Sequence, residues 1–239
     1  MEQEFKWRLP ERNLTALRRY LRVKGDCLSE QTLRMAATYY ETPEGLLRKF
    51  GIALRIRQEN DRSVCCLKRT VHKEGALAER EEYETEAATL REAFERFPAA
   101  GVPADLCTAL AAQRYFELAK TRFTRHATLL RLRDPLTFTE FTAEFAVDAG
   151  TLGGNGKTEP FTEIELELKS GDAESFFRFA NALAAQFALT PEPESKLARA
   201  IRAAGQKGEP HEPENPSAPD GGSADSPADD GLPVEPQHL

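Results

Sequence analysis

The chain has 239 residues, 40% of them hydrophobic, which is enough for one large domain or two small ones with a proper core. Its formal charge of −7 comes from residues 205–239, where eight acids accompany one lysine, so the first 204 residues balance at 31 acids and 31 bases. That balance excludes a broad basic surface for nucleic acid, and because no run of eighteen apolar residues occurs we expect no membrane partner and a cytoplasmic protein.

The predicted elements begin with a strand over residues 2–9, in which charged and bulky side chains alternate. Pro10 then opens an amphipathic helix that carries Leu14, Leu17 and Leu21 on one face and ends near Gly25. Further strands are predicted at 32–41, 51–59, 63–70, 79–86, 114–125, 127–133, 138–148 and 160–169. Further helices are predicted at 89–96, 103–112, 173–187 and 195–203.

The last segment of the chain differs in composition from the rest. From Gly205 onward Pro and Gly supply twelve of thirty-five residues, and aromatic residues are absent. Such a segment cannot bury enough apolar surface to fold. We therefore predict a folded domain over 1–204 and a disordered acidic tail over 205–239.

Several of the predicted strands share an unusual property: one face is not merely polar but dense in charge of both signs. The period of two places on common sides the sets Glu2/Glu4/Lys6, Arg55/Arg57, Lys68, Arg80/Glu82/Glu84/Glu86, Arg131/Arg133, Glu144/Asp148 and Glu163/Glu165/Glu167/Lys169. One such strand would suit a sheet with a solvated face. Seven of them, with successive glutamates that repel one another, instead indicate a shared ligand.

A closed barrel would turn these charged faces inward and the apolar faces toward helices packed outside. Carboxylate clusters suit Mg²⁺ or Mn²⁺, which prefer oxygen ligands. Interleaved Arg and Lys suit phosphoryl oxygens, Arg through a bidentate fork and Lys as a point charge. The four cysteines contain no CxxC pair, and Cys65 and Cys66 would point to opposite faces of a strand, so we interpret them as reduced thiols.

Several motifs together resemble those of the CYTH superfamily, the triphosphate tunnel metalloenzymes. Glu2-x-Glu4-x-Lys6 resembles its ExExK signature, and the other matching segments follow in order. They are Tyr39-Tyr40-Glu41-Thr42-Pro43, residues 51–57 (GIALRIR), Leu67-Lys68, Arg80-Glu81-Glu82-Tyr83, Val147-Asp148-Ala149-Gly150, residues 163–172 (EIELELKSGD) and Ser195-Lys196. The resemblance covers residues 1–204. Within the superfamily, the chain most resembles the bacterial inorganic triphosphatases.

The resemblance implies an α+β fold: an eight-stranded antiparallel β-barrel, or tunnel, with helices packed on the outside. It implies catalytic roles for Glu2, Glu4, Lys6 and Glu165. It implies metal ligands, for Mg²⁺ or Mn²⁺, among Glu2, Glu4, Asp148, Glu163, Glu165 and Glu167. It implies substrate contacts from Lys6, Arg55, Arg57, Lys68, Arg80, Arg125 and Lys196, with Glu82 and Glu84 completing the acidic side. Arg122 and Arg125 lie on opposite faces of one strand, so only one of them can point inward without a bulge.

Three functions remain open at this point. The first is hydrolysis of a small anionic substrate, inorganic triphosphate, to diphosphate and phosphate. The second is a nucleotide reaction, as a class IV adenylyl cyclase or a thiamine or nucleoside triphosphatase. Such a substrate needs a place for its base or ring. Strand parity turns Phe5, Trp7 and Tyr83 away from the charged face, which leaves few inward aromatic rings for stacking a base. The third is a polyphosphate-binding module without turnover, which would not need the acidic set. The sequence does not determine the oligomeric state.

Overall fold

The computed structural model describes residues 2–8 and 13–205, and the end of the first predicted strand, the start of the first predicted helix and the predicted tail from residue 206 onward lie outside them. The strands are β1 (Glu2–Arg8), β2 (Asp26–Glu41), β3 (Ile52–Glu59), β4 (Arg62–Glu74), β5 (Leu77–Glu86), β6 (Phe116–Arg133), β7 (Glu140–Gly154), β8 (Lys157–Gly171) and the short β9 (Thr190–Pro191). The helices are α1 (Leu14–Lys24), α2 (Leu46–Lys49), α3 (Leu90–Arg96), the 3₁₀ turn η1 (Phe97–Ala100), α4 (Ala104–Ala111), α5 (Ala173–Phe187) and α6 (Lys196–Ala203).

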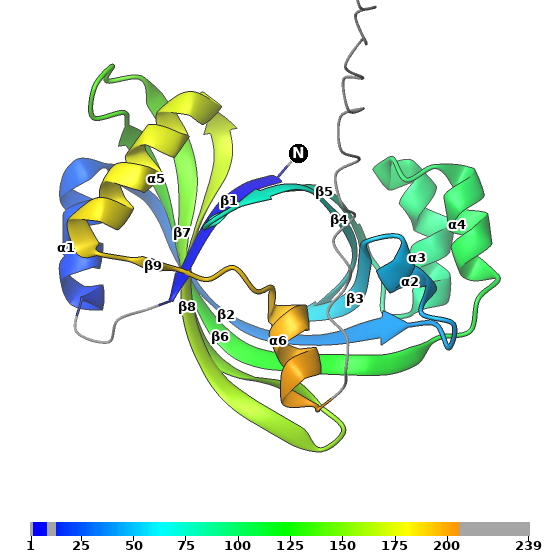
Figure 1. Ribbon diagram of the computed structural model, residues 1–239. Coiled ribbons are helices and arrows are strands. Elements are labelled where there is room, and N and C mark those ends of the chain that lie inside the picture. Colours follow the sequence, from blue (N-terminus) through cyan, green and yellow to red (C-terminus); the bar gives the residue numbers. More distant parts are fainter. Residues whose placement is uncertain (1, 9–12, 206–239) are drawn as a thin grey trace, which may run out of the picture.

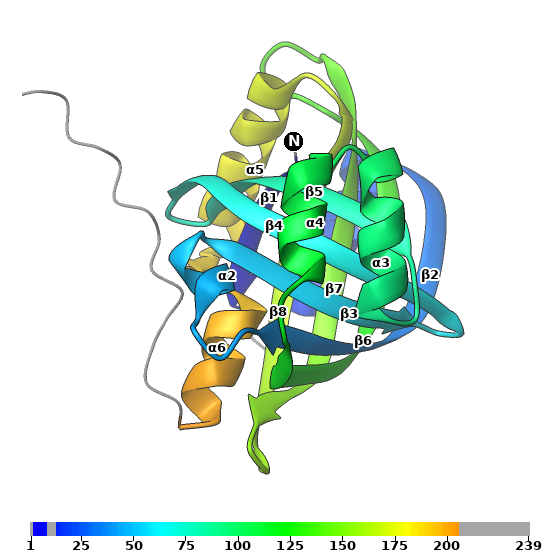
Figure 2. The ribbon, with the colours of Figure 1, turned by 90° about the vertical axis from the view of Figure 1, so that its right-hand side faces the viewer.

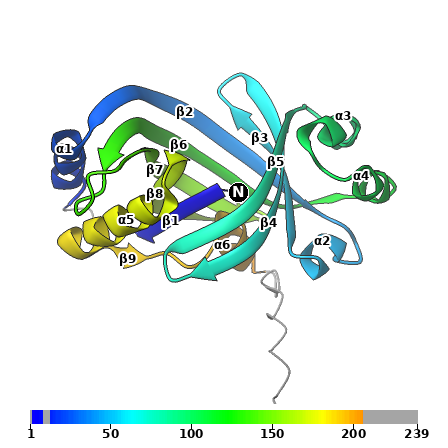
Figure 3. The same cartoon turned by 90° about the horizontal axis from the view of Figure 1, so that it is seen from above.

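The eight long strands form a closed antiparallel barrel, as predicted (Figure 1). The strand order is β5-β4-β3-β2-β6-β7-β8-β1, and β1 also pairs with β5, which closes the ring. β1 is therefore the seam: Glu2 lies opposite Arg80 of β5, and Lys6 lies opposite Glu165 of β8. Helices flank this barrel on opposite sides (Figure 3).

Several predicted strand boundaries are wrong. The segments 114–125 and 127–133 form a single strand, β6, because pairing continues through His126 on both sides, to Thr32 of β2 and to Val147 of β7. The predicted strand at 32–41 likewise begins earlier, at Asp26. The alternation of apolar and polar residues near these points is too weak to show that pairing continues.

The outer face of β1, β7 and β8 is covered by α1 and α5. Phe5 and Trp7 of β1 are buried there, as strand parity predicts, and the ring of Phe5 meets the edge of Phe176 from α5 at 5.6 Å between centroids. Leu17 of α1 is fully enclosed in the same core. Packing of these apolar faces outside the barrel leaves the alternate side chains of each strand to point inward.

On the opposite side α3 and α4 cover the outer face of β3, β4 and β5 (Figure 2). Leu54 and Leu67 from the strands pack there against Phe94 and Phe97 from α3 and η1. Cys65 is buried in this outer core, while its neighbour Cys66 has the opposite parity.

Helix α6 is placed differently, because it packs against the inner face of β6 and its neighbours at one end of the barrel. Ala200 and Ile201 share a buried cluster with Phe123 of β6 and Phe161 of β8. Close approach of β7 to β6 nearby depends on Gly150, where an added Cβ would lie 2.2 Å from the carbonyl oxygen of Arg122. The VDAG segment therefore has a structural reason for ending in glycine.

No helix in the described part of the chain is long and apolar enough to cross a membrane.

Candidate functional site

The barrel encloses a cavity of about 610 Å³ whose wall is largely ionic; we call it the tunnel cavity. Each of the eight long strands contributes at least one residue to this wall. The lining residues that the sequence analysis named are Glu2, Glu4, Lys6, Arg55, Arg57, Lys68, Arg80, Glu82, Glu84, Arg125, Glu144, Glu165, Glu167, Lys169 and Lys196. A volume of this size suits a small anionic molecule.

Strand β3 supplies two arginines whose binding capacity is only partly used. Arg57 Nη2 donates to Glu84 Oε1 at 2.8 Å, and Arg55 Nη1 donates to the hydroxyl of Tyr39 at 3.4 Å. The Nε atoms of Arg55 and Arg57 are both buried without a hydrogen-bond partner among the described residues. Buried donors of this kind need an acceptor, and a phosphoryl oxygen would supply one.

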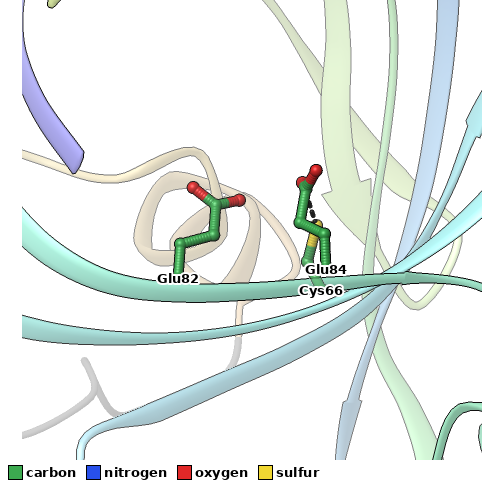
Figure 4. A group of neighbouring side chains, drawn as sticks. All are labelled: Cys66, Glu82 and Glu84. Carbon is green, nitrogen blue, oxygen red and sulfur yellow. Dashed lines mark hydrogen bonds between the residues drawn. The ribbon is translucent and has the colours of Figure 1, made fainter. Parts of the chain in front are cut away.

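Beside these arginines, on the neighbouring strands β4 and β5, lie a thiol and two carboxylates (Figure 4). Cys66 Sγ donates to Glu84 Oε1 at 2.8 Å, and burial raises the pKa of the thiol, which therefore stays protonated at neutral pH. Glu82 Oε2 lies 2.7 Å from Lys68 Nζ. Glu84 and Glu82 thus hold the cations of this wall in place.

The seam strand β1 contributes the three ExExK residues. Glu2 pairs with Lys68 at 3.1 Å, and Glu4 forms a short ion pair with Arg80. Lys6 Nζ donates to the carbonyl oxygen of Glu194 at 2.8 Å, and burial lowers the pKa of Lys6. The register with β8 places Glu4 opposite Glu167 and Lys6 opposite Glu165, whereas Glu2 lies opposite Arg80 of β5.

A second ionic cluster lies where α6 meets β7 and β8. Its carboxylates are Asp148, Glu163 and Glu165, which we call the acidic trio; all three are buried, with oxygens within 4.8 Å of one another. Arg125 donates to both oxygens of Asp148 at 2.8 Å in a bidentate fork and also pairs with Glu165. Lys196 contacts all three members of the trio.

The charges of this cluster shift the pKa values of its members in different directions. Despite burial, which acts in the opposite sense, the cations Lys196 and Arg125 hold the pKa of Glu165 well below its ordinary value. Burial raises the pKa of Glu163, and the nearby carboxylates raise the pKa of Lys196 despite its burial. Farther along β8, burial and the neighbouring Glu2 raise the pKa of Glu167 to about 7.

The donor set fits a hard divalent cation. The acidic trio offers three carboxylates close enough to share one ion, and Mg²⁺ and Mn²⁺ take such oxygen ligands in preference to nitrogen or sulfur. Cys66, Glu82 and Glu84 form a second group with ligand atoms within 4.8 Å, but its sulfur is a softer ligand.

The structure separates the predicted site residues into two sets. All the predicted substrate contacts line the tunnel cavity, and Arg125 rather than the exposed Arg122 points into it. Asp148 and Glu163 do not line it, because Lys196 lies over them. Arg131 and Arg133 are about half exposed or more and lie beyond the cavity, near Asp26 and Glu140.

Several residues of the site were missed by the sequence analysis. Arg199 pairs with Glu163 beneath the cavity, and its spacing of three from Lys196 on one helix face was a usable signal. Tyr39 and Phe123 line the cavity, so the few inward aromatic rings that the sequence leads one to expect come from β2 and β6. Their faces are covered by cations of the chain: Arg55 lies 6.0 Å from the Tyr39 centroid, and Lys196 lies 5.2 Å from that of Phe123.

Comparison with known proteins gives one family. The family model described as the CYTH domain matches residues 1–201. An inorganic triphosphatase of Haemophilus influenzae is 29% identical over 161 residues, which cover 65% of this chain and 42% of that protein. The match therefore spans about two fifths of the length of this relative.

Solved structures share the fold at low sequence identity. A Hippeastrum protein named as an adenylyl cyclase and reported to have a dominant triphosphatase activity is 18% identical with a TM-score of 0.53, covering 89% of this chain and all of that one. A protein from Pyrococcus horikoshii OT3 is 17% identical with a TM-score of 0.50, covering 82% of this chain and 96% of that one. These two likenesses concern the fold alone.

Proposed function

The chain belongs to the CYTH domain family, and on that premise we propose that it hydrolyses inorganic triphosphate to diphosphate and phosphate with Mg²⁺ or Mn²⁺. The family includes the curated inorganic triphosphatase to which the chain is similar. The observation that carries the proposal is the tunnel cavity itself, whose wall sets arginine and lysine side chains beside carboxylates. A polyanion and a divalent cation together would satisfy both signs of charge.

Binding of the substrate is the task of the cationic wall. Arg55 and Arg57 line the cavity and would donate from their guanidinium groups to non-bridging phosphoryl oxygens, while Lys68 adds a point charge. Lys6, Arg125 and Lys196 face the same cavity from the other side. A chain of three phosphoryl groups would thus have cations on both flanks.

Catalysis of phosphoryl transfer needs charge neutralisation and alignment more than a protein nucleophile. The cations would neutralise charge on the transferred and leaving groups, and the carboxylates of Glu2 and Glu4, which line the cavity, would orient water there. A divalent cation held by the acidic trio would add Lewis-acid stabilisation of the phosphoryl oxygens. Glu165 belongs to both sets, since it is a member of the trio and lines the cavity.

A nucleotide reaction is the second candidate, supported by the aromatic residues found in the cavity wall. Tyr39 and Phe123 could in principle stack a base. Their faces, however, already meet Arg55, Arg125 and Lys196. This arrangement favours the bare polyphosphate, because a base would have to displace the same cations that hold the phosphates.

The proposal is tested by comparing phosphate release from inorganic triphosphate, ATP, thiamine triphosphate and long polyphosphate. Each substrate is measured with Mg²⁺, with Mn²⁺ and with chelator, and cyclic AMP is followed in the ATP reaction. We expect triphosphate to be the preferred substrate and chelator to abolish release. Preference for ATP would promote the nucleotide reaction, and a rate insensitive to chelator would remove the metal from the mechanism.

Glu4→Gln tests the need for the acidic set. It should lower turnover by about 10²-fold or more, because the neutral amide can neither balance Arg80 nor orient water as a carboxylate does. Glu81→Gln on the outer face of β5, where Glu81 pairs with Arg69, is the matched control and should keep the wild-type rate.

Binding of triphosphate without release in the wild-type protein would indicate a binding module instead.

A further inference from the structure

We propose that Lys196 is an internal counter-ion of the acidic trio, which leaves the trio when a divalent cation binds there and then holds the triphosphate. The inference rests on the proposed function for the identity of the anion. Its consequence is that metal and triphosphate bind cooperatively, so that the metal–triphosphate complex is the preferred ligand.

The ammonium group of Lys196 occupies the place that a metal ion bound by the acidic trio would take. Its Nζ lies 2.9 Å from Asp148 Oδ2 and 2.7 Å from Glu165 Oε1, and it forms a shorter ion pair with Glu163. One ammonium group thus contacts every carboxylate that a metal ion would use. A metal ion and Lys196 therefore compete for the same oxygens.

The position of Lys196 makes this competition unavoidable. Lys196 and Glu165 line the tunnel cavity, whereas Asp148 and Glu163 have no exposed surface and do not line it. The Lys196 ammonium group contacts both of these carboxylates and, with the Arg125 guanidinium that donates to Asp148, lies on their cavity side. An ion that comes from the cavity reaches Asp148 and Glu163 only if Lys196 moves aside.

The charge balance argues in the same direction. The three carboxylates of the trio already face three cations, Lys196, Arg125 and Arg199. A divalent cation added to this balanced cluster would leave an excess of positive charge in a buried region, which is costly. A triphosphate in the adjacent cavity would offset that excess, and the released ammonium would be available to bind it.

The surroundings of Lys196 give its side chain somewhere to go. It is the first residue of α6, which Ser195 caps by accepting from the amide of Ala198 at 3.1 Å, so its backbone is fixed. The aliphatic stem is flexible, and the rings of Phe123 and Phe161 lie 5.2 and 5.9 Å from Nζ. A ring face can hold an ammonium group that has lost its carboxylates, on the side of the tunnel cavity.

The test measures binding of Mn²⁺ to the full chain through the electron paramagnetic resonance signal of free Mn²⁺. Imidotriphosphate, whose bridging nitrogens resist hydrolysis, serves as the anion. We expect the wild-type protein to bind Mn²⁺ at least about tenfold more tightly when the analogue is present, which is an ordinary coupling between two sites.

Lys196→Met removes the internal cation and keeps the aliphatic stem. The variant should bind Mn²⁺ alone at least about tenfold more tightly than the wild-type protein and gain much less from imidotriphosphate. Lys120→Met is the control, because Lys120 of β6 pairs with Glu117 and lies outside the tunnel cavity. It should keep the wild-type coupling.

Thermal unfolding supplies a second measurement in case Lys196→Met is only marginally stable. Mn²⁺ alone should raise its Tm more than it raises that of the wild-type protein, because a ligand that binds only the folded state stabilises it in proportion to its affinity. Lys196→Arg, which keeps a cation at this place, should respond as the wild-type protein does.

Two results would overturn the inference: equal Mn²⁺ affinity of the wild-type protein with and without imidotriphosphate, or the same change in Lys196→Met and Lys120→Met. Neither measurement needs turnover. Cooperative binding without phosphate release would leave the inference standing and remove the proposed hydrolysis, whereas phosphate release without cooperativity would do the reverse.

Discussion

At the scale of single residues, Asp134 shows how a carboxylate outside the tunnel serves the fold. It lies in the turn between β6 and β7 and has no exposed surface. Arg178 of α5 donates to it at 2.6 Å, and the amide of Leu136 and the hydroxyl of Thr137 donate at 2.8 and 3.0 Å. The hydrogen bond from Arg178, helped by the other two, holds the pKa of Asp134 well below its ordinary value.

This depressed pKa predicts a stability difference that depends on pH. The ionised form of Asp134 stabilises the folded state above the unfolded-state pKa of about 3.9, and the contribution is lost as pH falls toward the folded-state pKa. Asp134→Asn should therefore have a lower Tm than the wild-type protein at pH 7, and the difference should shrink below about pH 4. Thermal unfolding between pH 7 and pH 3 measures this.

The control for this prediction is Asp61→Asn, at an exposed position between β3 and β4. It should leave Tm close to that of the wild-type protein at every pH. If the Tm difference of Asp134→Asn stays constant down to pH 3, the carboxylate of Asp134 does not carry the stabilisation.

At the scale of elements, α5 and α6 are both amphipathic helices on one barrel but contact different faces of it. Leu183 of α5 is buried in the outer core, remote from the tunnel cavity. Ile201 of α6 is buried in the inner cluster with Phe123, and the same helix carries Lys196 and Arg199. Loss of packing should therefore affect the site only when it occurs under α6.

Leu183→Ala and Ile201→Ala test this difference. Each should lower the free energy of unfolding by about 2–5 kcal/mol, as truncation of a buried aliphatic side chain does. At a temperature where both variants are folded, Ile201→Ala should lower kcat/KM for triphosphate, and Leu183→Ala should not. Denaturant unfolding and initial rates measure the two effects, and an equal loss of activity in both variants would contradict the role given to α6.

The sequence was sufficient to predict the elements whose two faces differ strongly. Phe5 and Trp7 against Glu4 and Lys6 gave the orientation of β1, and the family resemblance gave the closed barrel of eight strands. The inner face at β2 and β6 was harder, because Tyr39 and Phe123 are apolar residues that point inward toward α6 and the cations. Periodicity shows which residues share a face but cannot show which layer covers it.

The candidate site was predictable as a set of residue types and not as a set of contacts. The family resemblance grouped the glutamates of β1 and β8 in one site, but it could not show that Asp148 and Glu163 lie beneath Lys196. That arrangement depends on where α6 docks, which is a long-range property. The hydrogen bond from Cys66 to Glu84 could not be predicted either, because a cysteine in a strand gives no sign of which group its thiol contacts.

At the scale of the whole molecule, the three hydrophobic clusters and the tunnel cavity lie within the described residues up to Gly205. The predicted boundary between a domain over 1–204 and a tail over 205–239 stays a prediction, and truncation of the chain tests it. A chain that ends after Gly205 should keep the Tm and the kcat/KM of the full chain. A large drop in either quantity would show that the remaining residues belong to the folded unit or to the site.

Closure of the barrel at β1 has a consequence for synthesis of the chain. β1 is synthesised before one of its partners, β8, which lies about 160 residues later, since Glu4 pairs with Glu167. At ribosomal rates of about 5–20 residues per second, one edge of β1 waits roughly 10–30 s for its partner. During that interval the nascent protein exposes an unpaired strand edge, the kind of surface that chaperones shield from aggregation.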